Sequence, residues 1–125
     1  MFRQIILAGM GGFVGAALRF LVSRYFQMSL SSGFPWGTFV VNIVGSFLIG
    51  LFYGLSERGN VMSADSRLFL TVGVCGGFTT FSTFSNESLT LLQNKDFLNL
   101  SVYVGFSFVL GLVAVYVGRQ LVKVG

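Results

Sequence analysis

Charged residues are missing from four long stretches of this 125-residue chain, and this pattern constrains its fold more than any other feature. Residues 4–18, 25–56, 68–86 and 97–118 contain no Asp, Glu, Lys or Arg. A helix that crosses a membrane needs roughly 17–25 residues, so each of the last three stretches suffices alone. The first is short, but Arg19 beside it can reach the headgroup layer and extend the helix.

The composition indicates a membrane protein with one domain. Charged residues make up 10% of the chain, against about 25% in a soluble domain, and 54% of the residues are hydrophobic. Too few charges remain to cover a surface that faces water. We therefore predict an all-α membrane protein, a single transmembrane domain over residues 1–125. Its four predicted helices span residues about 4–25, 36–56, 67–92 and 98–120.

The composition also excludes several classes of function. The sequence has no histidine and one cysteine, Cys75, so it lacks the ligands for a transition-metal site and the residues for a Cys/His nucleophile. It contains no phosphate-loop motif, which argues against ATP hydrolysis. We therefore do not expect an enzyme. The net charge of +4 comes from basic residues scattered at predicted helix ends, which favours membrane lipid over nucleic acid as a partner.

Positive charge specifies the orientation in the membrane only weakly. With four spans, both termini lie on one side, and the positive-inside rule places them inside by a small margin. Such a bias is typical of an ordinary protein with few charges or of a chain that inserts in both orientations, and both interpretations remain open. The basic residues divide into Arg3, Arg58, Arg67, Arg119 and Lys123 on the terminal side and Arg19, Arg24 and Lys95 on the other.

The third predicted helix contains an unusual segment, GVCGGFTTFSTF at Gly73–Phe84. Hydrocarbon penalises unpaired polar groups, so a broken, hydroxyl-rich stretch is tolerated only when it is buried in protein or lines a polar path. A break near Gly76 and Gly77 would expose carbonyls on one side, which favour a cation, and amides on the other, which favour an anion. A packing kink is the alternative, because glycine pairs often produce one.

The second predicted helix carries a polar stripe at every fourth residue, with Thr38, Asn42 and Ser46 as its first members. An amide in the middle of a membrane helix is costly unless it is paired. Asn42 therefore has two interpretations. It makes an interhelical hydrogen bond, worth roughly 1 kcal/mol or less, or it donates to a permeating anion. The stripe favours the second.

Phe81 and Phe84 lie among hydroxyls on nearly the same face of the third predicted helix. Aromatic ring edges carry partial positive charge and can line an anion path weakly. The chain has 15 phenylalanines, so lipid or core contact is the competing interpretation. Arg19 can draw anions into a vestibule or reach headgroups, and Glu87 can gate the path, pair with a base or face the interface.

The fourth predicted helix places Tyr103, Ser107 and Gly111 on one face. Four helices make too thin a bundle to enclose a water-filled path, so a homodimer is the economical arrangement. A proton-coupled exporter typically needs a carboxylate deep in the membrane, and the first, second and fourth predicted helices contain none there. This absence favours passive conduction.

The sequence resembles the fluoride channel family known as Fluc or CrcB. Three blocks carry the resemblance: GGFVGAALRF at Gly11–Phe20, GTFVVNIVGSFLIG at Gly37–Gly50 and GVCGGFTTFSTF at Gly73–Phe84. Each block is a weak signal alone. Their order and spacing, together with the chain length, are highly specific, and the match spans the full chain.

The resemblance implies an antiparallel, dual-topology homodimer of four-helix subunits in the bacterial inner membrane, with two fluoride pores. It also implies a structural sodium ion on the dimer axis, held by backbone carbonyls at positions that match Gly76 and Thr79. Arg19 and Thr38 would line a vestibule, and Glu87 would gate the pore or contact it laterally. The implied pore residues are Asn42, Phe81, Phe84, Thr83, Tyr103 and Ser107.

The implied function is a fluoride-selective passive channel that exports cytoplasmic fluoride and so limits its toxicity. The polar track of the fourth helix begins at Tyr103 and Ser107, whereas Gly111 and Val115 stand where some relatives carry hydroxyls, which leaves the end of the track open. Two alternatives remain. One is a small dual-topology exporter of cationic drugs, and the other is a non-transporting membrane scaffold whose polar groups only join helices.

Overall fold

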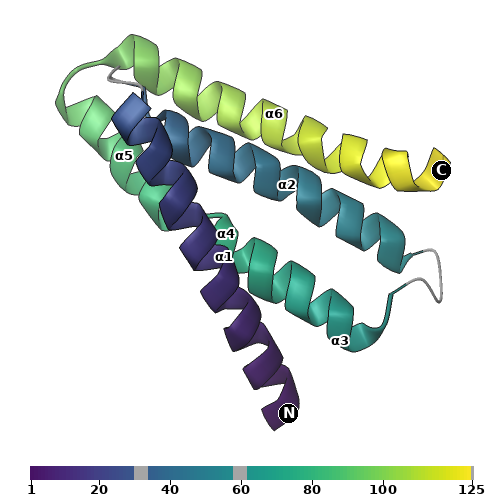
Figure 1. Cartoon of the computed structure of the whole chain (residues 1–125). Helices are drawn as coiled ribbons and strands as arrows, with labels where there is room; N and C mark the ends of the chain where they lie inside the picture. Colours follow the sequence, from purple (N-terminus) through teal and green to yellow (C-terminus); the bar gives the residue numbers. More distant parts are fainter. Residues whose placement is uncertain (30–33, 58–61, 125) are drawn as a thin grey trace.

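The computed structural model describes residues 1–29, 34–57 and 62–124, and in these residues it contains helices and no strands (Figure 1). Four helices are long and apolar enough to cross a membrane, which confirms the predicted all-α membrane class. The third of these spans is bent. The three uninterrupted spans are α1 (Phe2–Ser29), α2 (Trp36–Ser56) and α6 (Phe97–Val124).

Four segments make up the third span, and Thr79 and Thr80 interrupt it. Both residues are extended, with ψ angles of 157° and 121°. One segment, η1, is a π-helix, which the sequence did not predict. The segments are α3 (Ala64–Arg67), η1 (Leu68–Cys75), α4 (Gly76–Phe78) and α5 (Phe81–Gln93).

The break lies beyond the glycine pair at which it was predicted. Gly76 is helical, with φ −63° and ψ −37°. A Cβ atom on Gly77 would lie 2.5 Å from the carbonyl oxygen of Gly12, so this glycine lets α4 approach α1 closely. The Thr80 side chain instead begins the next helix, because it accepts the N–H of Thr83 at 3.2 Å and caps α5. The glycines serve helix packing, and the threonines end the helix.

Two close helix contacts form the body of the structure. α2 and α6 lie side by side, and α1 crosses η1 and α4 (Figure 1). Glycines make both contacts. A Cβ atom on Gly11 or Gly15 would lie closer than 3.0 Å to the backbone of the third span, and one on Gly50 equally close to the backbone of α6. This packing fixes the first half of the third span against α1.

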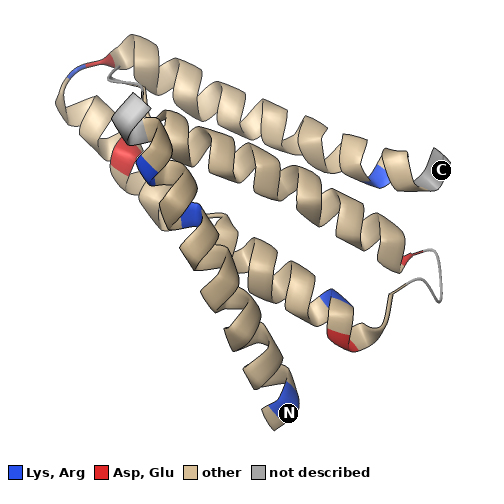
Figure 2. Ribbon diagram, in the orientation of Figure 1, with Lys and Arg blue, Asp and Glu red and all other residues tan. Residues whose placement is uncertain are grey.

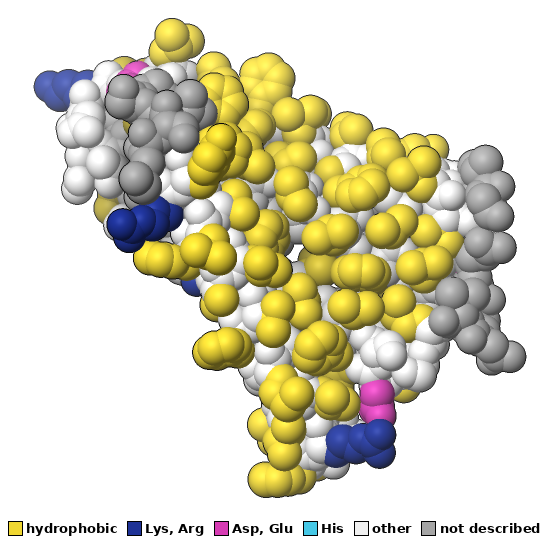
Figure 3. Space-filling view, in the orientation of Figure 1, with side chains coloured by type: hydrophobic (Ala, Val, Ile, Leu, Met, Phe, Trp, Pro, Cys, Tyr) yellow, Lys and Arg dark blue, Asp and Glu magenta, His cyan; other side chains and the backbone are white. Residues whose placement is uncertain are grey.

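Most charged residues lie near the two ends of the bundle (Figure 2). At one end, Arg3 is 2.5 Å from Asp65, and Arg119 pairs with Glu57. Arg58, which contributed to the predicted charge bias, lies outside the described residues. Large hydrophobic side chains are exposed between the ends (Figure 3), as expected of a surface in contact with lipid.

Candidate ion pathway

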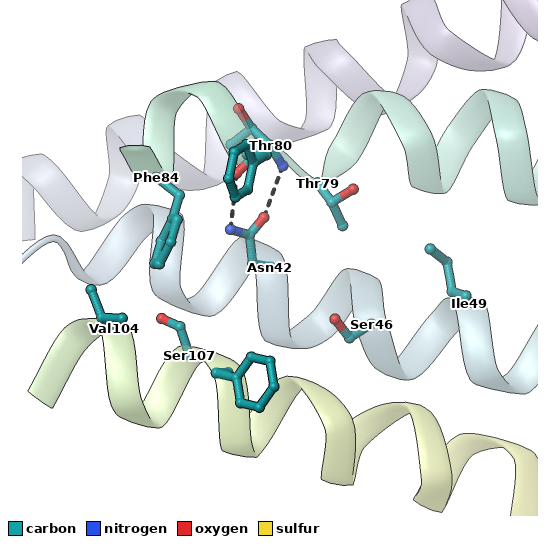
Figure 4. Close-up of a pocket in the computed structure, with 10 residues that line it drawn as sticks. Asn42, Ser46, Ile49, Thr79, Thr80, Phe84, Val104 and Ser107 are labelled. Carbon is teal, nitrogen blue, oxygen red and sulfur yellow. Dashed lines mark hydrogen bonds between the residues drawn. The ribbon is translucent and has the colours of Figure 1, made fainter. Parts of the chain in front are cut away.

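A groove of about 390 Å³ opens where the break in the third span faces α2 and α6 (Figure 4). Four of the predicted pore residues, Asn42, Phe81, Phe84 and Ser107, line it. It combines neutral hydrogen-bonding groups with aromatic rings at the middle of the bundle. The other lining residues are Ser46, Ile49, Thr79, Thr80, Val104 and Phe108.

The side chain of Asn42 joins α2 to the break. Its Nδ2 donates to the Thr80 carbonyl oxygen at 3.0 Å, and its Oδ1 accepts the Thr80 N–H at 2.8 Å (Figure 4). Both backbone groups of this extended residue are thereby paired at membrane depth. The structure therefore shows the interhelical hydrogen bond, which was the less favoured of the two interpretations of Asn42. One N–H of Nδ2 remains after the bond to Thr80, so the same side chain can still donate into the groove.

The break also changes the partners of two backbone carbonyls. In an uninterrupted helix, the N–H of Thr80 would bond the Gly76 carbonyl, and that of Thr83 would bond the Thr79 carbonyl. Here Asn42 Oδ1 and the Thr80 hydroxyl accept these two N–H groups instead. The carbonyls of Gly76 and Thr79 are therefore open to another donor or to a cation.

These two carbonyls fit the sodium ion that the resemblance implies. Carbonyl oxygens released at a broken membrane helix are suitable ligands for Na⁺. Within the described residues, no group of three or more His, Cys, Asp or Glu side chains could hold a metal ion. A cation at the break would therefore depend on neutral oxygens such as these carbonyls.

Arg19 lies beside the break. Its Nε donates to the Gly77 carbonyl at 3.3 Å, and the residue is partly buried. The guanidinium therefore sits at the C-terminal end of α4, where a positive charge is stabilised by the helix dipole. This position favours the interpretation in which Arg19 acts near the ion path over the one in which it reaches the headgroups.

A second polar group of residues lies beyond Phe84. The ring centroid of Phe84 is 4.9 Å from that of Tyr103, which is fully buried. The Tyr103 hydroxyl donates to Glu87 Oε1 at 3.2 Å, and the Thr38 side chain lies beside it. We call Thr38, Glu87 and Tyr103 the Tyr103 cluster. It brings together residues from α2, α5 and α6, and it gives Glu87 a hydroxyl partner.

The local environments of Phe81 and Phe84, of Ser107 and of Thr83 differ. The rings of Phe81 and Phe84 are tilted by 38° with centroids 6.1 Å apart, so they are not stacked within one chain. Ser107 Oγ is buried without a hydrogen-bond partner among the described residues, which leaves it free to bind an ion or a water molecule. Thr83 is not among the groove-lining residues, and its backbone N–H belongs to the cap of α5.

Two polar groove residues were absent from the predicted site. Ser46 belongs to the stripe on α2, which therefore carried a usable signal for it. Thr80 was one hydroxyl among several in the third span, and no sequence pattern distinguished it from the others. Its importance comes from its extended backbone and its bonds to Asn42, 38 positions away in the sequence.

Comparisons with known proteins agree with this architecture. A family model described as "CrcB-like protein, Camphor Resistance (CrcB)" matches residues 6–119. A Bacteroides fragilis protein named "Fluoride-specific ion channel FluC" is 50% identical over 122 residues, which cover 95% of each chain. A protein of the same name from Phocaeicola vulgatus is 47% identical over 116 residues, 93% of this chain and 95% of the relative.

A third protein of that name, from Flavobacterium psychrophilum, is 41% identical over 121 residues, 97% of this chain and 98% of the relative. The family model and these three relatives each match nearly the whole sequence. The chain therefore belongs to the CrcB family.

Proposed function

We propose that this protein is a fluoride-selective channel through which cytoplasmic fluoride leaks passively out of the cell. The relatives that match nearly the whole chain are named as fluoride-specific ion channels. The main structural support for the proposal is the groove at the helix break, where neutral amide and hydroxyl groups converge at membrane depth. The protein is a multi-pass protein of the bacterial inner membrane, and its role is to limit fluoride toxicity after hydrogen fluoride enters and dissociates.

Conduction requires that the groove replace the water around fluoride without trapping the ion. The remaining Asn42 N–H and the unpaired Ser107 hydroxyl supply hydrogen-bond donors. The edges of Phe81 and Phe84 supply weaker positive charge. All these groups are neutral, so binding can be loose enough for release.

The rest of the pathway extends to either side of the groove. The positive charge of Arg19 beside the break raises the local concentration of anions. Beyond Phe84, the hydroxyls of Tyr103 and Thr38 continue the track. We assign Glu87 the role of a gate or lateral contact, because its carboxylate accepts the Tyr103 hydroxyl at that point.

We further infer that two copies assemble as an antiparallel homodimer with two pores. The groove is open on the side of Phe81 and Phe108, which are 79% and 70% exposed. An ion path cannot lie open to hydrocarbon, so another surface must cover it. A second copy is the economical cover, and the weak charge bias is compatible with insertion in both orientations.

A structural sodium ion on the dimer axis completes the proposal. The carbonyls of Gly76 and Thr79 would hold it, since their usual amide partners are engaged elsewhere. A Cβ atom added to Gly76 would have only the Thr71 carbonyl oxygen of its own span, 3.7 Å away, as a neighbour. The ion's charge would stabilise the carbonyls that the break leaves unpaired.

Fluoride efflux from liposomes tests the proposed function. Purified protein is reconstituted in vesicles loaded with fluoride, and a fluoride electrode records efflux when a potassium ionophore shunts the membrane potential. We expect rapid efflux without a proton gradient. Efflux that requires a proton gradient would instead identify a coupled exporter, and vesicles without any ion movement would leave only a scaffold role.

A further inference from the structure

We propose that Asn42 is a positioning residue for the cation, because its side chain keeps the Thr80 N–H away from the Gly76 carbonyl. This inference rests on the proposed function, and in particular on the sodium ion at the break. It assigns Asn42 a task that is separate from donating to fluoride. The two tasks use different atoms of one amide, so they can be separated by experiment.

The argument starts from competition for one hydrogen. The Thr80 N–H has two candidate acceptors, the Gly76 carbonyl four residues earlier and Asn42 Oδ1 on the neighbouring helix. The structure shows it bonded to Asn42 at 2.8 Å. A carbonyl that already accepts this N–H is a weaker ligand for a cation. The cation site therefore exists because α2 supplies a competing acceptor.

The position of α2 makes that competition effective. Asn42 Nδ2 also binds the Thr80 carbonyl at 3.0 Å, so the amide holds both backbone groups of the extended residue. One turn further along α2, a Cβ atom on Gly45 would lie closer than 3.0 Å to the Thr79 methyl group. The helix thus fits against the break at two successive points. Bonds to the backbone on both sides of Thr80 stabilise the extended conformation over the helical one.

The remaining N–H of Asn42 belongs to a groove-lining residue, and its Oδ1 holds the Thr80 N–H that would otherwise bond the Gly76 carbonyl. An anion in the groove and a cation at the break would therefore both depend on Asn42. Such linkage is reciprocal in binding free energy. If Asn42 acts on the anion alone, its loss would change fluoride flux and leave sodium affinity untouched.

Two substitutions separate these roles. Asn42→Leu removes both the donor and the acceptor, so the Thr80 N–H can return to the Gly76 carbonyl. We expect sodium affinity to fall about tenfold or more, the equivalent of one hydrogen bond. Asn42→Asp keeps an oxygen at the Oδ1 position and adds a negative charge near the cation, so we expect sodium affinity at least equal to that of wild type, although fluoride flux falls in both variants.

Thermal unfolding against sodium concentration measures that affinity without any flux. Purified protein in detergent is heated at increasing NaCl, with N-methyl-D-glucamine chloride added to hold ionic strength constant. A bound ion raises the unfolding midpoint as its concentration passes the Kd. Val44→Ala is the matched control, because Val44 is on the same helix, 41% exposed and absent from the groove lining. It should show the sodium dependence of wild type.

The outcomes are distinct for each claim. The inference fails if Asn42→Leu keeps wild-type sodium affinity, or if Asn42→Asp loses affinity as fully as Asn42→Leu. Should Asn42→Leu not fold, Asn42→Ser replaces it, because its shorter side chain does not reach both Thr80 groups. Wild-type protein that conducts fluoride but shows no sodium dependence overturns this inference and the proposed sodium site, and leaves the proposed channel function intact. Wild-type protein that conducts no fluoride overturns the proposed function.

Discussion

The two halves of the third span meet at the break and have different roles. The first half, through η1 and α4, is held against α1 by backbone contacts that only glycine permits. The second half, α5, has one buried residue, Leu91, and carries Phe81 and Phe84 beside the groove. This difference shows how a short bundle can fix the position of a break rigidly while leaving side chains beyond it free for an ion or a partner.

Replacing Asn42, which binds the break between the two halves, should have the largest effect. Asn42→Asp adds negative charge where fluoride must pass. Two like charges about 4 Å apart at an effective dielectric constant near 20 repel by roughly 4 kcal/mol. We expect fluoride efflux to fall about a hundredfold or more, with the oligomeric state unchanged by size-exclusion chromatography. A well-folded variant with wild-type flux would remove Asn42 from the pathway.

A substitution in the first half should affect stability. Gly77→Ala places a Cβ atom 2.5 Å from the Gly12 carbonyl oxygen, so α1 must move away. Overpacking of this kind costs about 1–3 kcal/mol, which thermal unfolding in detergent would measure. Gly105→Ala is the matched control, because no atom lies within 4 Å of its added Cβ. Equal stability of the two variants would show that the α1 contact is not tight.

A substitution in the second half should change flux and spare stability. Phe81→Ile removes a ring edge worth about 1 kcal/mol to a passing anion, so we expect efflux to fall about fivefold. Phe13→Ile on α1 controls for the loss of an exposed ring, since Phe13 and Phe81 are 77% and 79% exposed. Equal efflux from both variants would contradict the distinction between the two halves.

The smallest effect is expected at the end of the bundle that lies away from the break. Glu57→Gln breaks the pair with Arg119, whose side chain is 38% exposed. Pairs this exposed contribute about 0–1 kcal/mol, so the unfolding midpoint should shift slightly and efflux should stay at the wild-type rate. Asp65→Asn, which breaks the pair with Arg3, should behave in the same way. A large loss of efflux would place the ion path nearer to this end.

The sequence predicted the spans well because their cause is local. Hydrocarbon excludes charge, so charge-free stretches mark helices, and the predicted span 36–56 coincides with α2 (Trp36–Ser56). The break was predicted in the correct span but at the wrong residues. Its position depends on the bonds between Asn42 and Thr80, and no property of the third span alone reveals a partner on another helix.

The site was predicted in part for the same reason. The polar stripe at every fourth residue of α2 pointed to Asn42 and Thr38 as site residues, because helix periodicity puts such residues on one face. It could not show that these two residues serve different polar groups, one at the break and one with Tyr103. That division follows from how α5 and α6 pack, which is a tertiary property. The assembly of two copies and the sodium ion remain predictions.

The central claim, passive and selective conduction of fluoride, is tested most directly by the reversal potential of the current. Purified protein is placed in a planar bilayer with a tenfold fluoride gradient at equal pH and a constant concentration of other salts. The account predicts a current that reverses at the fluoride equilibrium potential, roughly 59 mV in magnitude at 25 °C. A reversal potential that follows the proton gradient instead, or the absence of any current from folded protein, would contradict it.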